Sequence, residues 1–203
     1  MTKLPETKAE ASMRMSRAKD IERLDFCGPQ VFVTIEAGVG VEKESFTVHQ
    51  QVISRWSLFF RAAFESNFTE GLTKLMTFDD VEGDIFGMPV NWIYLKEIVR
   101  GDEKRVTYLN LAKLWSLGER FIMPQLQNAV MDMFTGYDDP SNEHEPARTY
   151  EDEGREKFIE AVYNFVKHVY QATSIACPLR PLCVKTVLLV TGHLKSGIAE
   201  QGT

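Results

Sequence analysis

Two short runs of β-branched and aromatic residues open the regular hydrophobic pattern of the chain. They are residues 31–35 (VFVTI) and residues 45–48 (SFTV), and the stretch between them contains Gly38 and Gly40. Strand-forming runs separated by glycines are typical of a β-hairpin, because glycine adopts the backbone angles that tight turns require. We therefore predict a hairpin with Gly38 and Gly40 in its turn.

Helical periodicity follows the hairpin. Apolar residues at helical spacing predict two short helices between residues 52 and 64, with Ser57 as the N-cap of the second. A brief third strand is predicted at residues 74–78, and either Asp79 or Asp80 can cap the helix that follows it. Two further helices are predicted at residues 108–121 and from Pro124 to Phe134, as a pair behind the small sheet. The fold class is therefore α+β, with a small mixed sheet flanked by helical hairpins.

Changes in composition divide the chain into four parts. Residues 1–28 lack a sustained apolar face and are predicted to form a flexible N-terminal tail, and residues 29–135 hold the sheet and the helices described above. Residues 136–156 are rich in Asp, Glu, Pro and Asn, which is typical of an acidic surface loop. Residues 157–203 are predicted to form a C-terminal helical extension, whose apolar faces should pack back onto the first module.

Charge and cysteine content limit the partners and the compartment. The formal net charge of −6 argues against direct binding to nucleic acid, and charged residues and prolines interrupt every apolar stretch long enough to approach a membrane span. Three cysteines leave one thiol unpaired in any disulfide pairing, and the first residues do not resemble a signal peptide. We expect a reducing compartment, cytoplasmic and/or nuclear, with no membrane association.

No motif specifies catalysis, a metal or a cofactor. Gly38 and Gly40 lack the third glycine of a dinucleotide-binding loop, and Cys177 and Cys183 have no histidine at zinc-binding spacing. His49 and Ser57 are close in sequence, but a core histidine and a helix cap explain them better than a catalytic pair. The sequence therefore predicts a protein that is not an enzyme and has no cofactor.

Several segments in a characteristic order resemble the BTB/POZ family. The order and spacing of these segments carry the resemblance: residues 46–64 (FTVHQQVISRWSLFFRAAF), 67–70 (NFTE), 75–80 (LMTFDD), Phe86, 92–94 (WIY) and 114–128 (LWSLGERFIMPQLQN). The resemblance covers residues 29–135 and assigns His49, Ser57, Phe60 and Tyr94 to the structural signature of the family. It implies the BTB/POZ fold and a role in protein–protein interaction, as a homodimer or as a module that docks other proteins.

The C-terminal part is similar to a narrower group. Residues 169–173 (VYQAT) and 178–180 (PLR) resemble the segment that follows the BTB core in many fungal members, which consist of this domain and a C-terminal helical extension. In the wider family some members link substrates to cullin-type ubiquitin ligases, and others act in transcription or as scaffolds. Fold is thus implied more firmly than role.

The chain departs from the family at two positions and contains one candidate contact site. Gln30 stands where many dimeric members have an acid, and Trp56 occupies the position of its basic partner. The segment Phe68-Thr69-Glu70 resembles the cullin-contact motif of adaptor members, which implies a substrate adaptor for a cullin-type ubiquitin ligase. Two alternatives stay open: Phe68 closes the core over its loop, or the protein is a self-associating scaffold or transcription regulator without a ligase connection.

Overall fold

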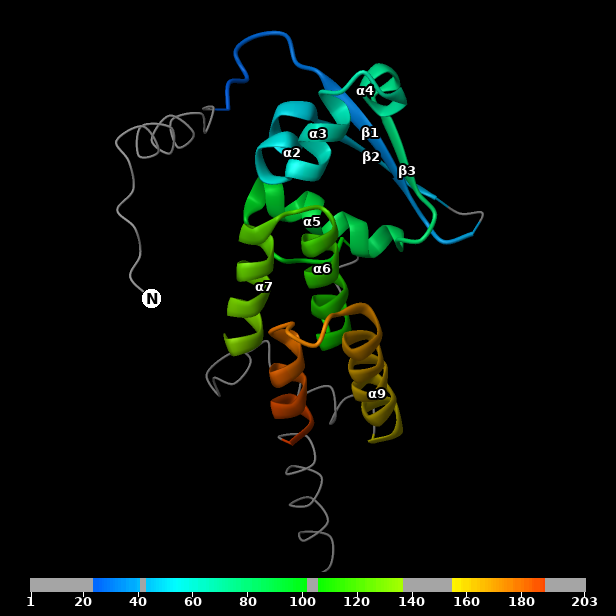
Figure 1. Cartoon of the computed structure of the whole chain (residues 1–203), viewed down its shortest axis with the longest axis vertical. Coiled ribbons are helices and arrows are strands. Elements are labelled where there is room, and N and C mark those ends of the chain that lie inside the picture. Colours follow the sequence, from blue (N-terminus) through cyan, green and yellow to red (C-terminus); the bar gives the residue numbers. More distant parts are fainter. Residues whose placement is uncertain (1–23, 41–42, 102–105, 137–154, 189–203) are drawn as a thin grey trace, which may run out of the picture.

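The computed structural model describes residues 24–40, 43–101, 106–136 and 155–188 (Figure 1). Most of the expected N-terminal tail and acidic loop, and the last part of the expected C-terminal extension, lie outside the described residues. The elements in chain order are β1 (Phe32–Ala37), β2 (Glu44–His49), α2 (Gln50–Trp56), α3 (Leu58–Phe64), α4 (Thr69–Thr73), β3 (Leu75–Phe78), α5 (Gly83–Leu95), α6 (Tyr108–Arg120), α7 (Pro124–Gly136) and α9 (Arg155–Ala172). A last helical segment covers residues 179–188.

The sheet has the strand order β2-β1-β3 and buries one face. β1 pairs with β2 in the antiparallel sense and with β3 in the parallel sense, which confirms the predicted mixed sheet. Val33, Ile35 and Ala37 of β1 are buried, whereas Thr34 and Glu36 between them are partly exposed. This alternation follows from the two-residue period of a strand. Gly40 has φ +87° in the predicted hairpin turn, where an L side chain would be strained.

Ser57 joins α3 to the rest of the core. Its hydroxyl accepts the backbone N–H of Phe60 at 3.1 Å, which confirms it as the N-cap of α3, and donates to the carbonyl of Phe121 at 2.6 Å. The side chain is fully buried, so both bonds are shielded from water. Ser57 thus caps α3 and also connects it to the end of α6.

The prediction that Asp79 or Asp80 caps α5 is wrong. Glu82 is the N-cap residue, and its side chain makes no capping hydrogen bond. Asp79 instead pairs with Lys43 at 2.7 Å, and Asp80 pairs with Arg120 at 2.7 Å. The aspartates lie too far before the first turn of α5, and cations from distant segments stand within their reach.

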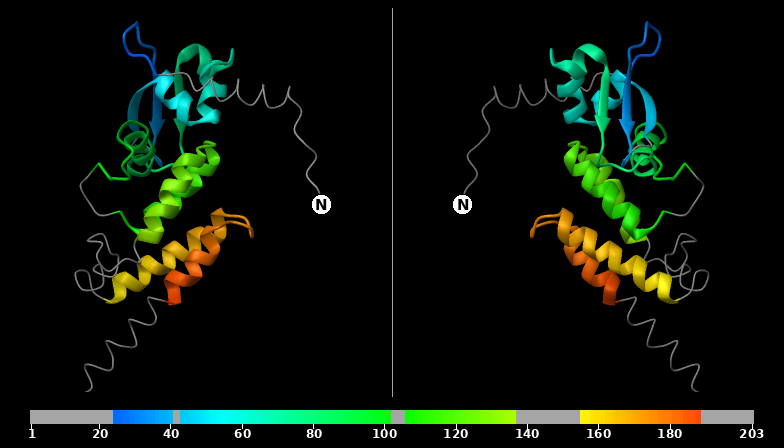
Figure 2. Two further views of the ribbon diagram at one scale, coloured as in Figure 1. Left: turned by 90° about the vertical axis from the view of Figure 1, so that its left-hand side faces the viewer. Right: turned by 90° about the vertical axis from the view of Figure 1, so that its right-hand side faces the viewer.

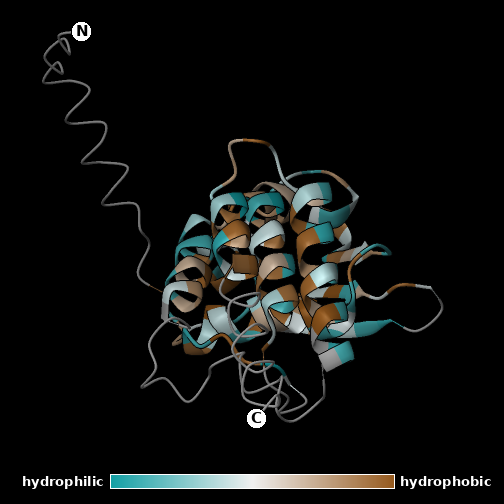
Figure 3. Cartoon of the chain, turned by 90° about the horizontal axis from the view of Figure 1, so that it is seen from below, coloured by the Kyte–Doolittle hydropathy of each residue, from teal (hydrophilic) through white to brown (hydrophobic). Residues whose placement is uncertain are grey.

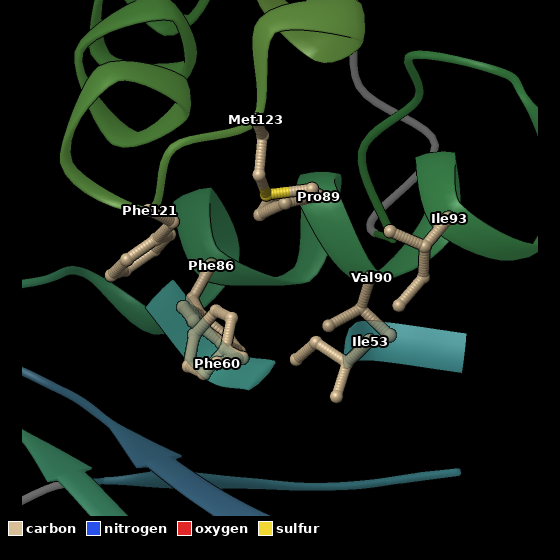
Figure 4. Close-up of a pocket in the computed structure, with 8 residues that line it drawn as sticks. All are labelled: Ile53, Phe60, Phe86, Pro89, Val90, Ile93, Phe121 and Met123. Atoms are coloured by element: carbon tan, nitrogen blue, oxygen red, sulfur yellow. The ribbon is translucent and has the colours of Figure 1, made fainter. Parts of the chain in front are cut away.

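Five phenylalanines form the centre of the core, between the sheet and the helices. Phe60 has its ring centroid 4.8 Å from that of Phe121, and the other members are Phe59, Phe78 and Phe86. Beside this cluster lies a cavity of about 10 Å³ whose lining is entirely apolar (Figure 4). A space of this size without polar partners stays dry and cannot hold a cofactor.

The helices that follow β3 form layers below the sheet in Figure 1. α5 lies between the sheet and the α6–α7 hairpin, and α9 with residues 179–188 forms the layer farthest from the sheet (Figures 1 and 2). The predicted helical pair therefore lies behind α5 and not directly behind the sheet. Figure 3 shows hydrophobic and hydrophilic residues on different faces of the same helices at this end, as amphipathic packing requires.

A second aromatic cluster joins α9 to the α6–α7 hairpin. Tyr108, Phe134 and Phe165 meet with ring centroids 5.6 to 6.0 Å apart, and Phe165 is fully buried. His168 of α9 lies 3.3 Å from the hydroxyl of Ser116 on α6. Burial lowers the pKa of His168, and the positive charge of Lys113 acts in the same direction.

Ile122 is strained in the turn between α6 and α7. Its φ is +52°, a left-handed conformation that β-branched residues rarely adopt, and its side chain is half exposed. We expect Ile122→Gly to raise the free energy of unfolding by about 1 kcal/mol, because glycine has no Cβ to clash in this conformation. Urea denaturation checks this prediction, and an unchanged or lower midpoint would contradict it.

Candidate partner-binding surface

α4 is a short helix held tightly against the end of α3. The hydroxyl of Ser66 donates to the carbonyl of Ala63 at 2.8 Å and accepts the backbone N–H of Phe68 at 3.2 Å. Gly71 is buried, and a Cβ at this position would lie 1.9 Å from the carbonyl oxygen of Ser66. Only glycine allows this approach without a backbone shift, so Gly71 determines where α4 sits.

This placement turns apolar side chains outward. Phe68 is 74% exposed and Leu72, one helical turn later, is 73% exposed. Leu75 at the start of β3 is also exposed, because the inward positions of that strand are taken by Met76 and Phe78. We call Phe68, Leu72 and Leu75 the α4 face.

The three predicted contact residues, Phe68, Thr69 and Glu70, lie at the start of α4 and differ in exposure. Phe68 is the N-cap residue of α4, Thr69 is exposed and Glu70 is half-buried in the first turn. The alternative that Phe68 closes the core is wrong, since most of its side chain faces solvent. An aromatic residue of this exposure loses much water-accessible area when a partner covers it.

His49 and Tyr94, both assigned to the family signature, meet on another surface. The backbone N–H of His49 donates to the Tyr94 hydroxyl at 3.0 Å, and His49 Nδ1 lies 2.8 Å from the same oxygen. The rings of Phe26 and Phe32 pack on His49, and both are about half exposed. The expectation of a core histidine is wrong, because His49 is only half-buried. We call Phe26, Phe32, His49 and Tyr94 the His49 face.

Gln30, the first of the two positions at which the chain departs from the family, lies in a network of polar side chains. The amide of Gln51 donates to the backbone carbonyl of Asp25 at 2.8 Å and to the side-chain oxygen of Gln30. Asp25 accepts the backbone N–H of Cys27 at 2.8 Å, which lowers the pKa of the carboxyl group. Polar side chains thus fill the place of the charged pair on the Gln30 side.

Trp56 is covered by a cation that sequence reasoning missed. The Lys96 ammonium lies 3.1 Å from the ring centroid of Trp56 and 4.0 Å from that of Trp92. Burial, with a smaller effect of Arg55, lowers the pKa of Lys96 to about 8. Forty residues separate Trp56 from Lys96, so no local spacing could have indicated the contact.

The described part of the chain offers neither a metal-binding cluster nor a membrane-spanning helix. There, no three side chains among His, Cys, Asp and Glu gather closely enough to hold a metal ion. Of the three cysteines, Cys27 is exposed, whereas Cys177 and Cys183 are buried as free thiols. None of the helices in the described ranges combines the length and apolar character needed to cross a bilayer.

Comparisons with known proteins match the sheet and the first helices. The family model described as "BTB/POZ domain" matches residues 32–135, slightly more than half of the chain, which confirms the resemblance. Kelch-like protein 40 of Xenopus tropicalis is 29% identical over 92 residues, which is 45% of this chain and 14% of the relative. Kelch repeat and BTB domain-containing protein 4 of Mus musculus is 30% identical over 95 residues, 44% of this chain and 18% of the relative. The chain therefore spans less than a fifth of the length of these relatives.

Proposed function

Because this chain belongs to the BTB/POZ family, whose domain is a protein-interaction module, we propose that it is a substrate adaptor that docks a cullin-type scaffold of a ubiquitin ligase through the α4 face. The exposure of Phe68 carries this proposal. The similarity to Kelch-like and Kelch-repeat BTB proteins supports it, and a cytoplasmic and/or nuclear location fits it. Neither catalysis nor a cofactor belongs to this role.

The α4 face has the features of an energetic centre in an interface. Phe68 and Leu72 stand one helical turn apart, and the backbone N–H of Leu72 donates to the carbonyl of Phe68 at 3.1 Å, which holds their spacing. Binding energy at interfaces is concentrated in a few such anchors. Glu70 lies between them in sequence and can fix the register by accepting hydrogen bonds from a partner.

Phe68→Ala tests the adaptor proposal. We expect it to weaken cullin binding by about 2 kcal/mol or more, which is about 30-fold in Kd, because the anchor is lost. The melting temperature should stay nearly unchanged, because the removed side chain is largely in water. Isothermal titration calorimetry with a purified cullin N-terminal domain measures the first quantity and differential scanning calorimetry the second.

Val39→Ala is the matched control, because Val39 is 63% exposed but lies in the β1–β2 turn. It should leave both cullin binding and stability unchanged.

Glu70→Ala should weaken cullin binding without shifting the melting temperature. Absence of wild-type binding at tens of micromolar cullin would refute the adaptor proposal.

The second candidate function is a self-associating scaffold or transcription regulator without a ligase connection. The half-exposed aromatic rings of the His49 face favour it, because they lie beside the start of β1 and near Gln30, the position at which many dimeric members of the family have an acid. Sedimentation equilibrium of the wild-type chain and of Phe32→Glu distinguishes the candidates. A dimer that dissociates in Phe32→Glu, together with no cullin binding, would favour the scaffold.

A further inference from the structure

α9 has a second apolar face besides the buried one. Phe165 and Val169 are fully buried against the α6–α7 hairpin, whereas Ile159, Tyr163 and Tyr170 remain 47%, 62% and 47% exposed. Their spacings of four and seven residues place them along one side of the helix, about a third of a turn from the buried face. We call Ile159, Tyr163 and Tyr170 the α9 stripe.

The neighbouring helical segment extends this surface. The guanidinium of Arg180 lies 4.9 Å from the ring centroid of Tyr170, so the Arg180 side of the last helix adjoins the α9 stripe. Val184, one turn after Arg180, is on that side and is 49% exposed. The stripe is therefore the centre of a wider apolar surface made by two helices.

Charged residues flank the stripe in an order that is complementary to a second copy of the same helix. Glu160 and Lys167 are exposed and lie seven residues apart, on the same flank of the stripe. When two identical helices pack in antiparallel orientation, one flank of the first helix faces the same flank of the second. The residue order along the two flanks is then opposite. Glu160 of one copy then lies opposite Lys167 of the other, and the reverse contact forms at the symmetry-related place. In parallel pairing the same residues would not face each other.

We propose that the α9 stripe binds a second copy of this chain, with the two α9 helices antiparallel. The stripe lies at the opposite end of the molecule from α4 and the sheet (Figure 2), so this interface leaves the α4 face open. Two copies joined in this way present two docking surfaces to partners, which increases apparent affinity for a multivalent target. The interface is independent of the cullin proposal.

Charge exchange gives the first test. Sedimentation equilibrium should show a wild-type dimer, and Glu160→Lys and Lys167→Glu should each raise its dissociation constant at least about tenfold. The double variant should restore the wild-type value, because exchange of both charges recreates the complementary pair. Failure of the double variant to recover would overturn the proposal, since a merely structural role for either residue does not predict rescue. A wild-type chain that stays monomeric at about 100 micromolar protein would also overturn it.

Tyr163→Glu gives the second test, with Ala161→Glu as the control, because Ala161 is exposed and lies on nearly the opposite side of α9 from Tyr163. The first variant should dissociate the dimer and the second should not, while both keep the helical circular dichroism of the wild type. A dimer that survives Tyr163→Glu but dissociates in Phe32→Glu would assign self-association to the His49 face and overturn the proposal. This outcome leaves cullin binding unaffected, so the two proposals fail separately.

Disulfide trapping gives the orientation. In a Cys27→Ser background, Ile159→Cys chains mixed with differently tagged Tyr170→Cys chains should form a mixed disulfide on mild oxidation, because antiparallel pairing brings the two ends of the stripe together. Each variant alone should cross-link poorly. Efficient self-linking of Ile159→Cys would indicate parallel helices and contradict the antiparallel arrangement.

Discussion

Phe60→Ala is expected to lower the free energy of unfolding by about 3–5 kcal/mol. Phe60 is 1% exposed and contacts four other rings of the core cluster, with the nearest centroid at 4.8 Å. Truncation removes these contacts and enlarges the adjoining cavity. Because the lining of this cavity is apolar, water would not fill the added space. Urea denaturation followed by tryptophan fluorescence measures the change.

Leu58→Ala is the control for Phe60→Ala, because Leu58 lies on the same helix but is 55% exposed. Its effect should stay within about 0.5 kcal/mol, as for most surface substitutions. Equal destabilisation by the two variants would show that the helix itself, and not the aromatic cluster, carries the stability. A loss below about 1 kcal/mol in Phe60→Ala would contradict the proposed role of the cluster.

Phe165→Ala should have a comparably large effect, about 3–5 kcal/mol, if α9 unfolds together with the domain. Phe165 is fully buried and is the residue of α9 that enters the cluster of Tyr108 and Phe134. The same packing leads us to expect that a chain ending at Tyr137 has lower solubility or a lower melting temperature, since an apolar surface on α6 and α7 is uncovered. Thermal denaturation of both variants measures this.

Gln171→Ala, an exposed position on α9, is the control for Phe165→Ala and should change the melting temperature little. A truncated chain as soluble and as stable as the full chain would refute the structural role of the C-terminal helices. Two separate melting transitions in the full chain would show that α9 docks without sharing the stability of the domain.

Features that depend on neighbours in sequence were predictable without the structure. Apolar residues recur at every second position in β1 and at helical spacing in α6. This spacing indicates which side of each element faces the core, because the buried side needs apolar residues. Ser57 was recognised as a cap because a cap needs only a hydroxyl before a helical run. The family resemblance rests on the same local patterns, and the match to residues 32–135 confirmed it.

Features that depend on distant segments were decided by tertiary packing. The exposure of Phe68 follows from the close approach of Gly71 to Ser66, and an aromatic residue in a loop is compatible with either burial or exposure until that approach is known. Asp80 pairs with Arg120, forty residues later, and so is not a cap. His49 meets Tyr94, and Lys96 covers Trp56, through contacts between α5 and the β2–α2 region. Such pairs are set by how whole elements pack against one another, and the spacing of residues along a single element carries no record of them.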